Sequence, residues 1–213
     1  MIRLIGLGAG GHARVLLEIL ASDGRYEIAG LLDPDPALRG KAVAGVSVLG
    51  GDELLATLAA SGIGHVFMGL GSAANTQPRQ RLFEQAKSAG LQFVAVIHPG
   101  AVLAPSAQTG EGCAVLAGAI VGTGARLADN VIVNTRAVVE HDCRIESHAH
   151  IASGAVLAGN VSVGEGAHVG AGSVVRQGLR IGRGAVIGVG AAVVCDVPHD
   201  AVYVGVPARR LTR

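Results

Sequence analysis

A six-residue repeat runs through the C-terminal half of the chain and limits what this half can fold into. Counted from Ile97, the first position of every hexad down to Val193 is aliphatic except at Thr109, and the fifth positions, such as Ala101 and Ala119, are nearly all small. An amphipathic helix cannot give this period, because its faces recur every 3.6 residues, and a long helix would not tolerate so many glycines. One large and one small inward residue per hexad predicts a parallel β-helix in which three hexads, or eighteen residues, close each coil.

The composition agrees with a narrow, layered core. Half of the residues are hydrophobic, yet only 2% are aromatic, and there are 33 glycines. Stacked columns of Val, Ile, Leu and Ala fill a bore that is too narrow for aromatic rings. Cys113 and Cys143 fall in the column of small inward residues, which favours packing as their role. With three cysteines and no metal-type CxxC spacing, free thiols in a reducing compartment are expected.

The charge pattern and the first residues restrict the location and the partners. The formal net charge is +1, so no basic field indicates binding to nucleic acid or to an anionic membrane. The chain opens directly on a glycine-rich strand without a charged leader and cleavage site, and no apolar run reaches membrane-spanning length. We therefore expect a cytoplasmic protein without membrane insertion.

The N-terminal part alternates strand-like and helix-like segments. Strands are expected at 3–7, 28–32, 65–70 and 91–97, and helices from His12 and at 52–60 and 76–89. This alternation predicts a small Rossmann-like α/β domain with a parallel sheet. The predicted division is a nucleotide-sugar-binding domain at 1–96, a β-helix at 97–198 and a C-terminal tail at 199–213.

A glycine cluster follows the first predicted strand. Gly6, Gly8 and Gly11 match the spacing of a dinucleotide fingerprint, and Asp33 ends the second strand where a ribose-binding acid would lie. Such glycines let a phosphate approach the backbone at a helix N-terminus, although they also serve a simple tight turn. Fewer than about 100 residues precede the repeat, half of a two-lobed dinucleotide fold, which disfavours an NAD-dependent enzyme.

Four stretches carry a resemblance to a known family. They are GAGGHARV near the start, Val96-Ile97-His98-Pro99, NTRAVVEHDCRIESHAHIASGAVLAGNVSVG, and the tail VGVPAR. The chain resembles bacterial nucleotide-sugar N-acetyltransferases and sialic acid O-acetyltransferase-like proteins, which are hexapeptide-repeat acyltransferases. The resemblance implies left-handed coils, a homotrimer with active sites between subunits, and acetyl-CoA as co-substrate in the groove between neighbouring β-helices.

His141 is the candidate general base. Its hexad position lies outside the inward columns, and Glu140 and Asp142 flank it; a carboxylate partner raises the basicity of an imidazole. A solvated surface histidine is the alternative. The resemblance assigns the partner role to Asp142. Gly159 lies one coil after His141, and a glycine N–H there suits the stabilisation of an oxyanion, as the resemblance also implies.

The resemblance brings further residues into the predicted site. It places Asn134 near the catalytic histidine and implies contacts with acetyl-CoA from His150, Ala171 and Val189. Residues implied to bind the nucleotide sugar are Gly10, Gly11, His12, Asp33 and Pro34. The loop at 71–79 is longer than the family pattern, so the nucleotide (UDP, GDP or dTDP) and the sugar stay open.

Three other functions compete with N-acetylation of a 4-amino-4,6-dideoxy sugar, which a nucleotide-binding first domain favours. O-acetylation of sialic acid or a related sugar needs the same base and donor. A metal-dependent lyase of the carbonic anhydrase type could use histidine ligands, offered by His141, His148, His150 and His168; it would leave the first domain without a purpose, and no metal is expected. A non-catalytic scaffold would leave the Glu140-His141-Asp142 cluster unexplained.

Overall fold

The computed structural model describes residues 1–212, which form two compact units. The N-terminal unit comprises Met1–Gly71 and Pro78–Val96, and the C-terminal unit comprises Ser72–Gln77 and the chain from Ile97 onward. The sequence-based division had placed the whole of 1–96 in one domain, whereas the contacts of Ser72–Gln77 are made with the β-helix. Within residues 1–212, no helix combines the length and apolar character needed to cross a bilayer.

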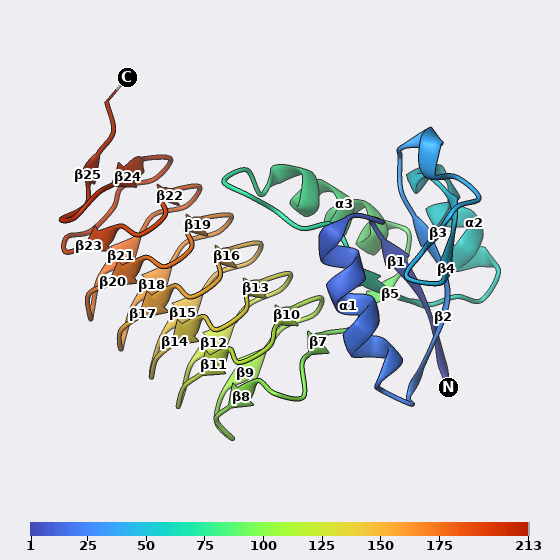
Figure 1. Ribbon diagram of the computed structural model, residues 1–213, viewed down its shortest axis with the longest axis horizontal. Coiled ribbons are helices and arrows are strands. Elements are labelled where there is room, and N and C mark those ends of the chain that lie inside the picture. Colours follow the sequence, from blue (N-terminus) through green and yellow to red (C-terminus); the bar gives the residue numbers. More distant parts are fainter. Residues whose placement is uncertain (213) are drawn as a thin grey trace. The chain divides into compact units, whose positions relative to one another are not determined.

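The N-terminal unit is a six-stranded sheet with the strand order β3-β4-β2-β1-β5-β6 (Figure 1). Pairing is parallel except for the β3–β4 hairpin, which the sequence analysis had missed. The strands are β1 (Ile2–Leu7), β2 (Tyr26–Leu32), β3 (Ala42–Val43), β4 (Val46–Gly50), β5 (His65–Met68) and β6 (Gln92–Phe93). The helices are α1 (Gly11–Ala21), α2 (Leu55–Ala60) and α3 (Gln77–Ser88), with short 3-10 turns η1 (Pro36–Leu38) and η2 (Asp52–Leu54).

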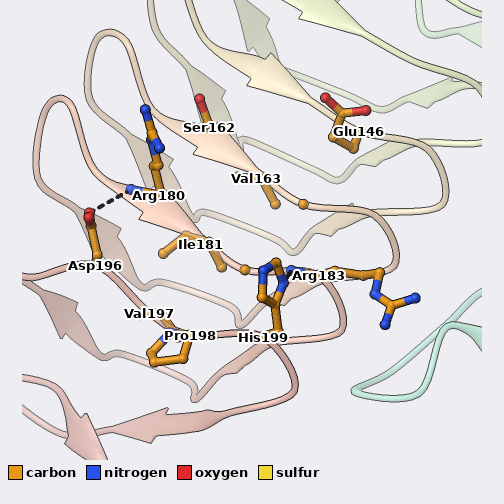
Figure 2. Close-up of a pocket in the computed structure, with 12 residues that line it drawn as sticks. Glu146, Ser162, Val163, Arg180, Ile181, Arg183, Asp196, Val197, Pro198 and His199 are labelled. Carbon is orange, nitrogen blue, oxygen red and sulfur yellow. Dashed lines mark hydrogen bonds between the residues drawn. The ribbon is translucent and has the colours of Figure 1, made fainter.

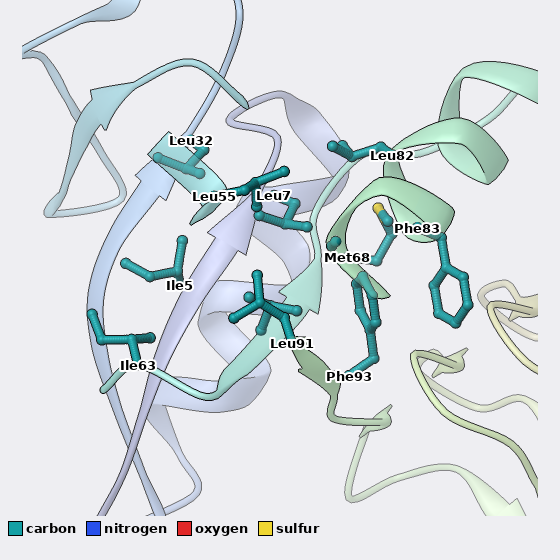
Figure 3. Packing of buried hydrophobic residues seen from close by; sticks show 12 residues of the cluster. Ile5, Leu7, Leu32, Leu55, Ile63, Met68, Leu82, Phe83, Leu91 and Phe93 are labelled. Carbon is teal, nitrogen blue, oxygen red and sulfur yellow. The ribbon is translucent and has the colours of Figure 1, made fainter. Parts of the chain in front are cut away.

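Aliphatic residues of the central strands and aromatic residues of α3 and β6 form the core of this unit (Figure 3). Ile5 and Leu7 of β1 are fully buried, and Phe83 stacks on Phe93 with ring centroids 4.3 Å apart. Burial of such side chains supplies about 1.5–3 kcal/mol each. This core holds the carboxyl ends of β1 and β2, where the glycine turn lies.

The C-terminal unit is a parallel β-helix with three faces (Figure 1). The first face contains β7 (Val96–Ile97), β10 (Ala114–Val115), β13 (Ile132–Val133), β16 (His150–Ile151), β19 (His168–Val169), β22 (Val186–Ile187), β24 (Val202–Val204) and β25 (Arg209–Arg210). The second contains β8 (Val102–Leu103), β11 (Ile120–Val121), β14 (Val138–Val139), β17 (Val156–Leu157), β20 (Val174–Val175) and β23 (Ala192–Val193). The third contains β9 (Gln108–Thr109), β12 (Arg126–Leu127), β15 (Arg144–Ile145), β18 (Ser162–Val163) and β21 (Arg180–Ile181). The tail predicted from 199 adds β24 and β25 to the first face.

The coils stack in a register of eighteen residues. Val115 pairs with Val133, which is followed by Ile151 and Val169 in the same inward column, and each of these side chains is fully buried. Most corners use a left-handed backbone at the fourth hexad position, which is usually glycine but is Asn or Asp at three corners and Arg136 or His148 at two others. Glycine adopts this conformation without steric cost, which accounts for much of the glycine content.

The outward columns give each face its own chemistry. On the second face the column is aliphatic and partly exposed: Val102 is 61%, Ile120 40% and Val174 50% exposed. On the third face the column is polar, with Arg126 paired in register to Arg144. On the first face it carries His150 paired to His168. We call the turns between the first and second faces corner 1–2 and those between the second and third faces corner 2–3.

Candidate functional site

His141 and Asp142 form a hydrogen-bonded pair at corner 2–3, directly after β14. The Nδ1 atom of His141 lies 2.9 Å from Oδ2 of Asp142. Neighbouring side chains on a strand would point to opposite faces, but Asp142 has φ +60°. Its left-handed backbone turns the carboxylate to the imidazole of the preceding residue. Because a carboxylate can only accept, Nδ1 carries the proton and Nε2 is left as the basic atom.

Gly159 lies one coil beyond His141 and directly beneath its ring. A Cβ on residue 159 would lie 2.3 Å from Nε2 and 2.5 Å from Cε1 of His141. Only glycine therefore permits this position of the imidazole. The carbonyl of Gly159 accepts from Gly178 N–H at 3.0 Å, whereas the N–H of Gly159 donates to no acceptor within residues 1–212. A basic nitrogen and an unpaired peptide N–H thus lie together on one corner.

A second group is formed by Asn134, at the start of corner 1–2, and His150, on the first face. Asn134 Nδ2 lies 3.1 Å from Nε2 of His150, and the ring of His150 meets that of His168 edge-on with centroids 4.9 Å apart. Burial lowers the pKa of His168. Asn134 therefore lies beside His150, and the second face separates both residues from His141.

Ala171 and Val189 occupy corner 1–2 in successive coils. Val189 is 81% exposed. The two groups of predicted residues therefore lie at opposite borders of the second face within one chain, His141 and Gly159 at one border and Ala171 and Val189 at the other. One protomer does not bring all of them together.

The glycine turn of the N-terminal unit joins β1 to α1. Gly8 has φ +100°, and a Cβ there would lie 2.7 Å from Leu70 N, so only glycine fits. Asp33 holds the turn in place, because its Oδ2 accepts from Ala9 N–H at 2.8 Å while Oδ1 accepts from Asp35 N–H at 3.0 Å. The structure thus gives Asp33 a structural contact that the sequence analysis had not foreseen. Pro34 follows it directly, at the end of β2.

A cavity of about 350 Å³ opens on this turn. It is lined by Ala9, Gly10, Gly11, Arg14, Ala42, Val43 and Ala44. Gly10 is the N-cap of α1 and makes no side-chain cap, which leaves helix N–H groups to bind an anion. The guanidinium of Arg14 lies 3.9 Å from a Cβ built on Gly11. Arg14 was not among the predicted residues, although its place in the first turn of α1 could have suggested it; His12 begins the same turn.

A larger cavity, about 410 Å³, lies on the third face (Figure 2). Two of its polar side chains are engaged with backbone: Asp196 Oδ1 accepts from Arg180 N–H and His199 Nδ1 accepts from Arg183 N–H, both at 2.9 Å. Its walls contain none of the predicted site residues. This cavity therefore lies apart from the predicted site residues.

The histidines considered as metal ligands are held apart. His141 lies at corner 2–3, His150 on the first face, and buried His148 at the third type of corner with Nδ1 2.9 Å from Asn130 Nδ2. Among residues 1–212, no group of three or more His, Cys, Asp or Glu side chains is arranged to hold a metal ion. The geometry gives no support to the lyase alternative.

Comparisons with known proteins cover the whole chain. A profile described as the PglD N-terminal domain matches residues 3–86. An asparagine-for-histidine variant of perosamine N-acetyltransferase from Caulobacter crescentus, in complex with CoA and GDP-perosamine, is 38% identical. The alignment covers 99% of this chain and 97% of that one, with a TM-score of 0.93. No match is found among curated protein sequences.

Two further solved structures are similar over nearly their full length. The acetyltransferase domain of PglB from Neisseria gonorrhoeae is 37% identical, covers 99% of this chain and 100% of that one, and has a TM-score of 0.91. WeeI from Acinetobacter baumannii is 26% identical over 98% of this chain and 100% of that one, with a TM-score of 0.82. These matches confirm the predicted fold class, an α/β domain followed by a left-handed parallel β-helix.

The partly buried carboxyl of Asp52, near Asp33, makes the stability of the protein depend on pH. Burial raises the pKa of its carboxyl, and the charges of Asp33 and Glu53 raise it further; Oδ1 is buried without a partner within residues 1–212. A raised folded-state pKa favours folding at low pH, and this contribution is lost as the pH rises through it. Asp52→Asn should therefore be more stable than the parent at pH 7, with the difference shrinking toward about pH 4.

Urea unfolding at several pH values measures this difference. Exposed Glu27→Gln removes the same charge from the surface and should stay within about 0.5 kcal/mol of the parent throughout. An Asp52→Asn protein that is less stable than the parent at pH 7 would contradict the expectation.

Proposed function

Because this chain belongs to the family of hexapeptide-repeat nucleotide-sugar acetyltransferases, we propose that it transfers the acetyl group of acetyl-CoA to the amine of a nucleotide-linked 4-amino-4,6-dideoxyhexose. The resemblance inferred from the sequence is confirmed at the level of the family, and the chain is an acyltransferase. The observation that carries the proposal is the His141–Asp142 pair lying against Gly159, whose N–H donates to no acceptor within residues 1–212.

Two relatives support the choice of substrates. The perosamine N-acetyltransferase was solved with CoA and GDP-perosamine, and the PglB domain was also solved with acetyl coenzyme A. These two substrates suit the two units of this chain. The β-helix carries the proposed base, and the N-terminal unit carries a glycine turn at the start of a helix, where a phosphate can bind.

His141 acts as the general base in the proposed reaction. Its Nε2 takes a proton from the attacking neutral amine, while Nδ1 donates to Asp142 and stabilises the charge that forms on the ring. The amine nitrogen attacks the thioester carbonyl, the C–N bond forms, and the C–S bond breaks. The proton held by His141 then passes to the departing CoA thiolate, so the transfer needs no covalent enzyme intermediate.

The N–H of Gly159 is the proposed oxyanion donor. It has no competing acceptor in the described chain and lies beside the base. Donors of this kind that are fixed before reaction lower the barrier by about 2.7–4 kcal/mol.

The exposed aliphatic column of the second face is the proposed contact surface of a homotrimer. Val102, Ile120 and Val174 expose apolar side chains in one column, and contiguous exposed apolar patches mark interaction sites. Around a threefold axis through this face, corner 2–3 of one protomer meets corner 1–2 of the next. His141 would then face the column of Ala171 and Val189 of the partner, along which acetyl-CoA is proposed to lie.

The cavity at the glycine turn is the proposed nucleotide-sugar site of the N-terminal unit. Gly10, Gly11 and the first turn of α1 offer N–H groups to a diphosphate. Arg14 adds a cation that can bind phosphate. His12, Asp33 and Pro34 border the same strand ends and are proposed to contact the nucleoside or the sugar.

A thiol-release assay with acetyl-CoA over a panel of acceptors tests the function. UDP-, GDP- and dTDP-linked 4-amino-4,6-dideoxy sugars should release CoA thiol, and one nucleotide should be preferred. Free sialic acid, which offers hydroxyl acceptors, should give only background. A response confined to sialic acid would instead establish the O-acetyltransferase alternative.

Substitution of His141 tests the base. His141→Asn and His141→Ala should lower kcat by about 10²–10⁴-fold, because proton transfer then falls to water. Gly159→Ala should also lose activity, since its methyl group displaces the imidazole. Sedimentation should show the same assembly as the parent in all three. Normal turnover in both His141 variants would remove this residue from the mechanism.

A charge on the second face tests the assembly. Val156→Glu, in the aliphatic outward column, should give monomers without activity, because a buried unpaired carboxylate opposes association. Gln108→Glu places the same charge on the third face and should remain a trimer with normal turnover. Light scattering coupled to size-exclusion chromatography measures both, and a trimeric Val156→Glu protein would show that the interface lies elsewhere.

A further inference from the structure

The segment Ser72–Gln77 packs on the β-helix and belongs to that unit by its contacts. At one end, the carbonyl oxygen of Ser72 lies 2.8 Å from Nδ1 of His150. At the other, the hydroxyl of Thr76 donates to the carbonyl of Gly166 at 2.8 Å, and Thr76 is 5% exposed. The hydroxyl of Ser72 also lies 3.2 Å from Nδ1 of His150. Hydrogen bonds to successive coils therefore fasten this segment, which we call the strap, across the first face.

The hydrogen bonds around His150 determine which ring nitrogen carries its proton. The N–H of Thr135 donates to Oδ1 of Asn134 at 2.8 Å, which fixes the orientation of that amide. Its Nδ2 therefore faces Nε2 of His150, which must accept. The carbonyl of Ser72 can only accept, so Nδ1 must carry the hydrogen. A peptide N–H at one end and a peptide carbonyl at the other thus hold His150 as the neutral Nδ1–H tautomer.

His150 makes these hydrogen bonds in its neutral form. A second proton, on Nε2, would point at the hydrogens of Asn134 Nδ2, and the two donors would repel each other. His168, edge-on at 4.9 Å, is itself held toward the neutral form because burial lowers its pKa. His150 therefore serves as a fixed hydrogen-bond acceptor rather than as an acid or base.

This arrangement leaves one N–H of Asn134 available. One hydrogen on Nδ2 donates to His150, and the other donates to no acceptor within residues 1–212. Asn134 immediately precedes Thr135, which begins the corner 1–2 column that continues through Ser153 to Ala171. A donor at that border suits a carbonyl oxygen lying along the corner.

We propose that the strap is a positioning element of the acetyl-donor site. Through Ser72 it fixes the tautomer of His150, and His150 fixes the amide of Asn134, whose remaining N–H donates to an amide or thioester carbonyl of acetyl-CoA. The inference rests on the proposed function for its ligand. Ser72, Thr76 and His150 act through Asn134 and are positioning residues.

Nitrogen-15 NMR of the histidines tests the tautomer without an activity assay. In the trimeric protein, His150 should show the neutral Nδ1–H form at pH 7. Asn134→Asp places a carboxylate against Nε2, so it should raise the pKa of His150 and make the ring an imidazolium. An Nε2–H tautomer in the parent protein, or an unchanged titration in Asn134→Asp, would overturn the inference.

Substitution at Thr76 tests the strap. Thr76→Val keeps the shape but removes the bond to Gly166, and should raise the Kd of CoA by calorimetry and the KM of acetyl-CoA by about threefold to tenfold. The KM of the nucleotide sugar should stay unchanged. Thr76→Ser retains the hydroxyl and should restore parent values, and exposed Thr57→Val in α2 is the matched control.

The outcomes separate this inference from the proposed function. Parent-like CoA binding in Thr76→Val would overturn the proposed role of the strap, even if the protein has full acetyltransferase activity. A parent protein that binds CoA, shows the fixed tautomer and responds to Thr76→Val but acetylates no amino sugar would refute the proposed function and leave the strap in place.

Discussion

The eighteen-residue parallel register is the constraint on which the rest of the structure depends. It lines up each residue with the one a coil away, so side chains form columns instead of isolated contacts. Inward columns of Val and Ile make a core without aromatic rings, and outward columns give three faces of different character. The same register puts Gly159 under His141, where a methyl group would meet the imidazole. Core packing and the proposed chemistry therefore follow from one repeat.

The sequence predicts what is periodic. The β-helix, its inward columns and the placement of residue 159 one coil from 141 follow from counting, because each hexad position has a fixed orientation in the fold. The partner of His141 was left open between Glu140 and Asp142. The corner backbone decides it, since Asp142 has φ +60°. Asn and Asp tolerate that conformation better than most residues, so the Asn and Asp residues at fourth hexad positions indicate left-handed corners.

The sequence does not predict what is unique. Ser72 meets His150 across 78 positions, and no period or motif links the two. The prediction therefore placed the whole loop with the first domain. The role of Asn134 as the neighbour of His150 was missed for the same reason, and so was the contact of Asp33 with the glycine turn. Arg14 differs, because the first turn of a helix after a glycine loop is a recognisable place for a phosphate-binding cation.

The solvent exposure of the His141–Asp142 pair bears on the proposed assembly. The side chains of His141 and Asp142 are 51% and 66% exposed in the isolated chain. Water screens the interaction between the two side chains of a pair this open to solvent. In the proposed trimer, a neighbouring β-helix would cover the second face and exclude this water. Its own corner 1–2, with the donor groups there, would then face His141. His150 is already buried in the single chain, so its hydrogen bonds do not need a neighbouring subunit to exclude water. In the proposed trimer the base would therefore depend on the partner subunit, whereas the hydrogen bonds of His150 are complete within one chain.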